Sequence, residues 1–173
     1  MQKNNNLKLF LFILLIIIFS LFAFKVNTLQ IVDYEADKII WEQKVKNGES
    51  FNLKYLHSVA RTPVIEFFEI KDGKILLTGT EYQSYGAGLP TSAEEGDYIV
   101  ENDKFIIKNI DRFLPEILLR ISSNSQHEFN YNNQNYNLFD KAEKSNFLQI
   151  KTERTSYFKF IYKEVIKWLK KNI

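Results

Sequence analysis

The pair Asp72-Gly73 separates two runs of β-forming residues, EFFEIK and KILLTG. Asp-Gly is a preferred pair for the two-residue type I′ turn of an antiparallel hairpin. Such a turn fixes the register, which would pair Glu66 with Gly79. Because side chains alternate along a strand, one face would gather Glu66, Phe68, Ile70, Ile75, Leu77, Gly79 and Glu81. The sequence therefore predicts a hairpin with an apolar face that becomes polar at one end.

A third strand-like run, 51–57, precedes this hairpin. Aligning His57 with Glu66 matches apolar residues with apolar residues on the facing strand. A slip of one residue would instead turn polar side chains toward the core. On the favoured register His57 faces inward beside Glu66 and Glu81, which predicts a polar site at one end of the core.

Short strand-like runs continue along the chain, with turn residues between them. We expect them at 29–34, 38–45, 98–100, 105–108, 117–121, 127–131, 136–139 and 147–150, with an irregular link at 110–115 and a hairpin tip at 132–135. Short strands at this spacing are typical of an all-β domain. The predicted fold is therefore mainly β, an antiparallel β sandwich or partly open barrel.

The N-terminal region is apolar from Leu9 to Phe24 apart from one serine. Residues 7–24 would span roughly 27 Å as a helix at about 1.5 Å per residue, close to the thickness of a bilayer core. Signal peptides have shorter apolar regions and a small-residue cleavage site. We therefore favour an uncleaved anchor, with secretion as the alternative. Lys3 and Lys8 predict a cytoplasmic N-terminus and an extracytoplasmic body at the cell membrane.

The chain has no cysteine, which excludes disulfides, thiolate metal sites and thiol catalysis. Its net charge of +2 conceals an asymmetry, because residues 26–150 carry 13 basic and 19 acidic residues. A basic patch on the folded domain, as a nucleic-acid-binding protein needs, is not indicated. Basic ends beside an apolar segment fit an anionic membrane surface better.

The C-terminal segment, 155–173, has the pattern of a basic amphipathic helix. Four of its lysines recur at spacings of four, four and three, at Lys159, Lys163, Lys167 and Lys170. Its apolar side is formed by Phe158, Ile161, Val165 and Trp168 or Leu169. Thr155 or Ser156 is the expected N-cap. The apolar side would pack on the β domain or lie among lipid headgroups. The expected segments are thus an anchor at 1–26, a β domain at 27–152 and this helix at 153–173.

The motif YLHSV at 55–59, with TPV at 62–64, and the motif SYGAGLP at 84–90 resemble a small bacterial family of unknown function. Its genes commonly lie beside those of TAXI-type TRAP transporters, which take up small organic anions. The resemblance covers roughly 29–139 and is strongest over 55–90. It implies a mainly β extracytoplasmic domain with an accessory role around the transporter, and it supplies no catalytic residue.

The candidate ligand- or partner-binding residues are His57, Arg61, Glu66, Glu81, Tyr85, Gly86 and Gly88. Arg61 could pair with a carboxylate in two hydrogen bonds. The Gly86-Ala87-Gly88 turn could present backbone amides to an anion, or it could be a close chain crossing that needs glycine. His127 follows a polar loop and is interpreted as a surface residue.

Several chemistries remain open for His57 and Glu66. A carboxylate can orient an imidazole for general base catalysis, but Ser58 would point to the opposite face of the strand. One histidine with Glu66 and Glu81 suits zinc or calcium only loosely. A buried hydrogen-bonded pair is the simplest interpretation. We therefore assign no catalytic residue, metal ligand or cofactor.

The sequence leads to two main hypotheses. The first is a membrane-anchored accessory or binding module that works with a TRAP transporter for small organic anions and binds no nucleic acid. The alternative is a small hydrolase or metal-dependent enzyme that uses His57 and Glu66. A purely structural assembly protein is a third option.

Overall fold

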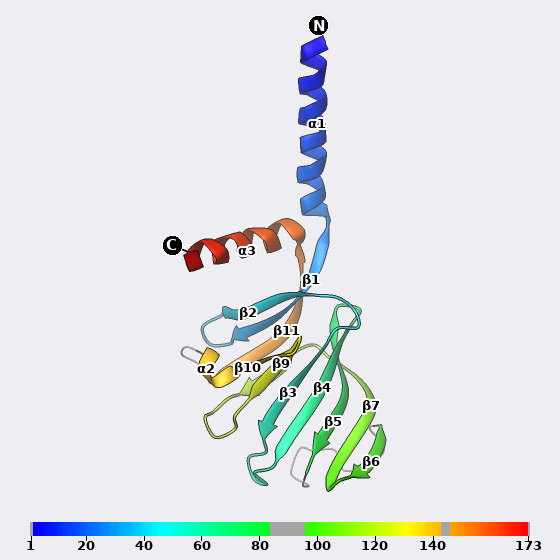
Figure 1. Cartoon of the computed structure of the whole chain (residues 1–173), viewed down its shortest axis with the longest axis vertical. Helices are drawn as coiled ribbons and strands as arrows, with labels where there is room; N and C mark the ends of the chain where they lie inside the picture. Colours follow the sequence, from blue (N-terminus) through cyan, green and yellow to red (C-terminus); the bar gives the residue numbers. More distant parts are fainter. Residues whose placement is uncertain (1, 84–95, 143–145, 173) are drawn as a thin grey trace. The chain divides into compact units, whose positions relative to one another are not determined.

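The computed structural model describes residues 2–83, 96–142 and 146–172 (Figure 1). The chain forms two compact units. The first, here called the terminal unit, consists of Met1–Thr28 and Arg154–Ile173. The second, the β domain, consists of Leu29–Glu153.

Two antiparallel sheets confirm the mainly β prediction (Figure 1). The smaller sheet has the order β2-β1-β11-β8, with β1 at Lys25–Asp33, β2 at Lys38–Val45, β8 at Ile117–Arg120 and β11 at Phe147–Ser156. The larger sheet has the order β10-β9-β3-β4-β5-β7-β6. Its strands are β3 (Ser50–Leu56), β4 (Pro63–Lys71), β5 (Lys74–Tyr82), β6 (Asp97–Glu101), β7 (Lys104–Leu114), β9 (Glu128–Tyr131) and β10 (Gln134–Asn137).

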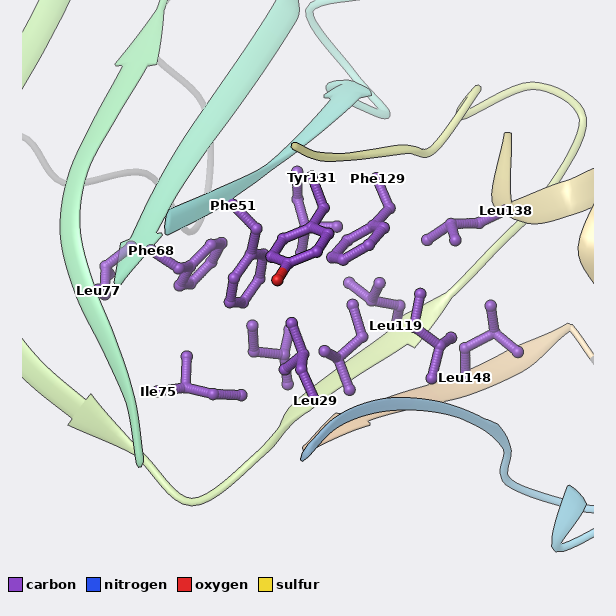
Figure 2. Packing of buried hydrophobic residues seen from close by; sticks show 14 of the residues in the cluster. Leu29, Phe51, Phe68, Ile75, Leu77, Leu119, Phe129, Tyr131, Leu138 and Leu148 are labelled. Carbon is purple, nitrogen blue, oxygen red and sulfur yellow. The ribbon is translucent and has the colours of Figure 1, made fainter. Parts of the chain in front are cut away.

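The core of the β domain lies between these two sheets (Figure 2). Phe51 stacks on Phe68 with ring centroids 4.9 Å apart, and both come from the larger sheet. Trp41 of the smaller sheet meets Phe129 of the larger sheet edge-on at 4.9 Å. Burying a large apolar side chain contributes about 1.5–3 kcal/mol, so this aromatic cluster is a main reason why the sheets stay together.

The hairpin of β4 and β5 confirms the predicted turn. Asp72 and Gly73 both have positive φ, 53° and 69°, as a type I′ turn requires. The predicted pairing continues from this turn as far as Phe68 opposite Leu77. A β-bulge then shifts the register, so that Glu66 lies opposite Thr80 and the predicted pairing of Glu66 with Gly79 is wrong.

The bulge changes which residues of β5 face the core. Thr80 and Tyr82 are buried, at 3% and 0% exposure, whereas Glu81 turns to the other face. A single extra residue inverts the alternation of a strand beyond it. For this reason Glu66 and Glu81 do not share a face, in contrast to the prediction.

The pairing of β3 with β4 also differs from the prediction. Leu53 lies opposite Glu66 and Tyr55 opposite Val64. The backbone N–H of His57 donates to the Thr62 carbonyl at 2.9 Å, which closes a tight loop instead of a long one. The observed pairing of β3 with β4 is displaced from the predicted pairing by an even number of residues. The strand β3 therefore keeps the predicted face toward the core, but His57 no longer lies opposite Glu66.

Two further segments differ from the expectations. The range 110–115 belongs largely to β7, which continues to Leu114 past a register shift and a positive φ at Asn109. The range 136–139 is not one strand, because Leu138 begins a short helix, α2 (Leu138–Lys141). The Asn137 side chain caps this helix by accepting from the Phe139 N–H. The hairpin tip is confirmed, with both turn residues, Asn132 and Asn133, at positive φ.

The terminal unit contains α1 (Gln2–Ala23) and α3 (Tyr157–Asn172). In the part of the chain that the structure describes, one helical stretch, Asn5–Ala23, is long and apolar enough to cross a membrane, with a mean hydropathy of 2.5. A signal sequence near the N-terminus has the same properties. The Ser156 hydroxyl accepts from the Lys159 N–H at 3.3 Å, in agreement with the predicted cap.

Candidate functional site

Both histidines of the chain line one pocket of the β domain, about 470 Å³ in volume. His57 lies just after β3, and His127 lies just before β9. The two strands are neighbours in the larger sheet, so residues 70 positions apart meet at the same sheet edge. Ser58, Arg120, Ser122, Ser125 and Asn146 supply further polar groups to the pocket.

His57 is held by the loop that follows it. The residue is 6% exposed, and its Nδ1 accepts from the backbone N–H groups of Val59 at 3.2 Å and Ala60 at 3.1 Å. A nitrogen that accepts two hydrogen bonds carries no proton, so the ring proton lies on Nε2. His57 can therefore offer an N–H donor at Nε2. Within the described residues it makes no bond to Glu66, and the expected hydrogen-bonded pair is wrong.

His127 is buried as well, at 8% exposure, although the sequence suggested a surface position. Its Nδ1 lies 2.9 Å from the Ser125 Oγ, and its ring stacks on Tyr55 at 5.3 Å. Burial lowers the pKa of His127, which keeps the imidazole uncharged near neutral pH. The alternation of side chains along a strand could have predicted the burial of His127. His127 precedes Phe129 and Tyr131 at intervals of two, and both of these residues are buried.

The segment 122–127 is fixed against the end of β3. The Leu56 N–H donates to the Ser125 carbonyl at 2.9 Å. Arg61, one of the predicted site residues, donates from Nη1 to the Asn124 carbonyl at 3.0 Å. The hydroxyls of Ser122 and Ser125 lie 2.9 Å apart. Arg61 therefore helps to build a wall of the pocket in this structure.

Arg120 gives the pocket a permanent positive charge. It is exposed at the end of β8, and its guanidinium lies 5.8 Å from the centre of the Phe147 ring. An arginine can bind a carboxylate through two parallel N–H donors. Together with the hydroxyl groups and the Nε2–H of His57, it forms a donor-rich lining.

Glu66 belongs to a separate polar patch on the inner face of the larger sheet. Burial raises the pKa of its carboxyl, and the charge of Arg112 opposes that rise. Burial also raises the pKa of the Tyr55 phenol, with a smaller contribution from Glu66. Thr80 lies opposite Glu66, and its buried hydroxyl has no hydrogen-bond partner in the described ranges. Tyr55 thus connects this patch with the histidine pocket, since its ring also stacks on His127.

Of the remaining predicted site residues, the structure describes Glu81, which does not line the pocket. Glu81 forms an ion pair with Lys104 at 2.6 Å on the other face of the sheet. Tyr85, Gly86 and Gly88 lie outside the described residues. No group of three or more histidine and carboxylate residues that could hold a metal ion occurs in the described part of the chain. His57, Glu66 and Glu81 are therefore not assembled as a metal site.

The pocket also contains a serine next to an imidazole. A serine and a histidine within hydrogen-bond reach can form a nucleophile and its base. However, the Ser125 Oγ also donates to the Ser122 carbonyl at 3.1 Å. Among the described residues, His127 contacts Ser125 and Tyr55 and has no carboxylate partner. The geometry favours hydrogen bonding of a small ligand over acyl transfer.

Comparison with known proteins adds one finding. A family model described as "Domain of unknown function (DUF1850)" matches residues 51–138. This match covers 88 of the 173 residues and includes both histidines. No curated protein and no solved structure matches the chain.

Proposed function

Because the chain belongs to the DUF1850 family, whose function is unknown, we propose its role from the site itself. The protein is a membrane-anchored extracytoplasmic binding module, and its ligand is a small organic anion. The observation that carries this proposal is the pocket in which His57, His127 and Arg120 come together.

The size and lining of the pocket support a small anion. Ligand pockets commonly have about 300–1,000 Å³ and a few polar groups that converge, and this one has about 470 Å³. Arg120 would pair with a carboxylate, and His57 would donate from Nε2. The uncharged His127 adds no second positive charge, which fits a ligand with one or two carboxylates better than a phosphate.

The anchor and the partner follow from other parts of the chain. α1 would tether the domain, and Lys3 and Lys8 favour a cytoplasmic N-terminus. The YLHSV and SYGAGLP motifs support an accessory role beside a TAXI-type TRAP transporter. A transporter of small organic anions would present the same class of ligand that the pocket fits.

Ligand binding can be tested through the histidines themselves. The full-length protein in detergent micelles, labelled with ¹⁵N-histidine, should give imidazole signals from two residues only. We expect titration with succinate to shift both sets of signals saturably and succinamide to leave them unchanged. Arg120→Gln should weaken binding at least about tenfold, since a hydrogen bond to a charged group contributes about 1.5–3 kcal/mol.

Arg154→Gln is the matched control, because Arg154 is also exposed but does not line the pocket. Equal responses to succinate and succinamide, or equal losses in both arginine variants, would contradict a site for carboxylates. The transporter association is tested separately by co-purification in mild detergent. Transporter subunits should accompany the wild type, and a clean wild-type preparation without them would refute the association.

A small hydrolase is the second candidate, in a form that differs from the prediction. His57 and Glu66 do not come together, but the Ser125 Oγ lies 2.9 Å from the His127 Nδ1. If this pair is catalytic, Ser125→Ala should abolish hydrolysis of p-nitrophenyl acetate, whereas Ser58→Ala should not. Equal background rates in the wild type and Ser125→Ala would exclude this candidate.

A further inference from the structure

Helix α3 exposes a continuous apolar face. Six large apolar or aromatic side chains recur on one side of the helix at intervals of three and four residues. They are Phe158 (42% exposed), Ile161 (41%), Tyr162 (60%), Val165 (49%), Trp168 (63%) and Leu169 (38%). A soluble helix normally buries such a stripe against a core. Within the terminal unit, the stripe on α3 stays exposed.

The opposite side of α3 is basic. Lys159, Lys163, Lys167 and Lys170 lie there at spacings of four, four and three. Glu164 is the single acidic residue of the helix, and it lies 4.0 Å from Lys167. A helix with an apolar face, lysines on the other side and a tryptophan and tyrosine in the apolar stripe is suited to the interface of an anionic bilayer.

Contacts with α1 place the start of α3 at the end of the apolar helix. The ring of Phe158 stacks on Phe22 with centroids 4.4 Å apart, and the Tyr157 N–H donates to the Phe24 carbonyl at 2.8 Å. Phe22 lies in the last turn of α1, one residue before its end. If α1 crosses the bilayer, this level is where hydrocarbon gives way to headgroups.

We propose that α3 is an interfacial helix that binds the anionic phospholipid surface on the side of the membrane where α1 ends. Its apolar face lies at the boundary of the acyl chains, and its lysines reach the lipid phosphates. The 16 residues of α3 would cover about 24 Å of the surface at about 1.5 Å per residue. The protein is thus held at two places, by a spanning helix and by a helix lying on the surface.

The proposal predicts where Trp168 lies, and Trp168 can be observed alone. The chain has two tryptophans, so Trp41→Phe leaves Trp168 as the sole tryptophan, which can be excited selectively at wavelengths that tyrosine does not absorb. This full-length variant is reconstituted in vesicles of phosphatidylcholine, with and without phosphatidylglycerol. We expect lipids brominated near the carbonyl to quench Trp168 strongly, and aqueous iodide to quench it weakly. Quenching by lipid should increase with phosphatidylglycerol.

Two controls make the result specific. Trp168→Phe leaves only Trp41, which packs in the core of the β domain and should not respond to brominated lipid. Changing Lys159, Lys163, Lys167 and Lys170 to Gln should remove the dependence on phosphatidylglycerol. The matched variant changes Lys44, Lys46, Lys74 and Lys108 to Gln, four exposed lysines of the β domain, and should keep that dependence.

Three results would overturn the proposal. Strong quenching by iodide without quenching by lipid would place α3 in water. Protection from both quenchers that grows with the ratio of protein to lipid would mean that a second copy covers the apolar face. Lipid quenching that is equal in neutral and anionic vesicles would reject an anionic surface as the partner.

Discussion

Individual residues explain why the site is held so firmly. Nδ1 of His57 accepts two backbone N–H groups from its own loop. The Nδ1 of His127 lies beside the Ser125 hydroxyl, and its ring stacks on Tyr55. One nitrogen of each ring is therefore occupied by the protein, which fixes the ring orientation before any ligand arrives. A preorganised donor such as the Nε2–H of His57 lowers the cost of binding.

Protonation of His127 should make the protein less stable in mild acid. Burial lowers the pKa of His127 below its ordinary value of 6.5, so the unfolded chain binds this proton more tightly than the folded chain. Its contribution to stability is present above the unfolded pKa and is lost as the pH falls toward the folded pKa. His127→Phe, which retains an aromatic ring against Tyr55, should reduce the fall in Tm below about pH 6.5.

The measurement is Tm against pH by circular dichroism for the wild type and His127→Phe. Glu66 is a second group of this region with a shifted pKa, and its pKa is raised. The contribution of Glu66 to stability therefore declines as the pH rises, whereas the contribution of His127 declines as the pH falls. Repeating the comparison in a Glu66→Gln background removes that slope. Parallel curves of Tm against pH for the wild type and His127→Phe would show that His127 does not cause the loss of stability in acid.

Among the elements, strand β5 decides the arrangement of polar residues on the larger sheet. The bulge near Thr78 turns Thr80 and Tyr82 inward and leaves Glu81 paired with Lys104 on the other face. The Thr78 hydroxyl donates to the Phe67 carbonyl at 3.1 Å, which uses one backbone acceptor at the irregular site. Bulges of this kind redirect side chains without ending a strand.

Gly79 is required by the close approach of β7 to this bulge. A Cβ at position 79 would lie 2.8 Å from the Ile107 carbonyl oxygen, a backbone atom that cannot rotate away. Gly79→Ala should therefore destabilise the fold by about 1–3 kcal/mol, as other overpacked sites do. Urea unfolding of the full-length protein in micelles measures this change. Thr78→Ala, which adds no atom, is the comparison, and an equal or smaller effect of Gly79→Ala would be evidence against backbone crowding.

At the scale of the whole molecule, the aromatic cluster joins the two sheets of the β domain (Figure 2). Phe68 is 2% exposed and stacks on Phe51. Phe68→Ala should cost about 3–5 kcal/mol, through lost burial and the cavity left behind. Phe67 is the neighbouring residue and is 38% exposed, so Phe67→Ala should cost much less. Urea unfolding of the two variants compares them directly, and equal losses would show that the cluster does not dominate stability.

The sequence alone determined the features that depend on local chemistry. The Asp72-Gly73 turn, the mainly β class and the cap of α3 follow from the φ preferences of turn residues, the two-residue period of strands and a serine hydroxyl that accepts a backbone N–H. The apolar character of α1 likewise follows from composition over one helix length.

Only the tertiary structure decided the site. The pairing of β3 with β9 brings His57 and His127 to one pocket, and no local sequence pattern encodes that residues 70 positions apart line the same pocket. The bulge in β5 separates Glu66 from Glu81, because one extra residue reverses every face beyond it. Register is set by the packing of whole sheets, and a single turn fixes it only as far as the first irregularity.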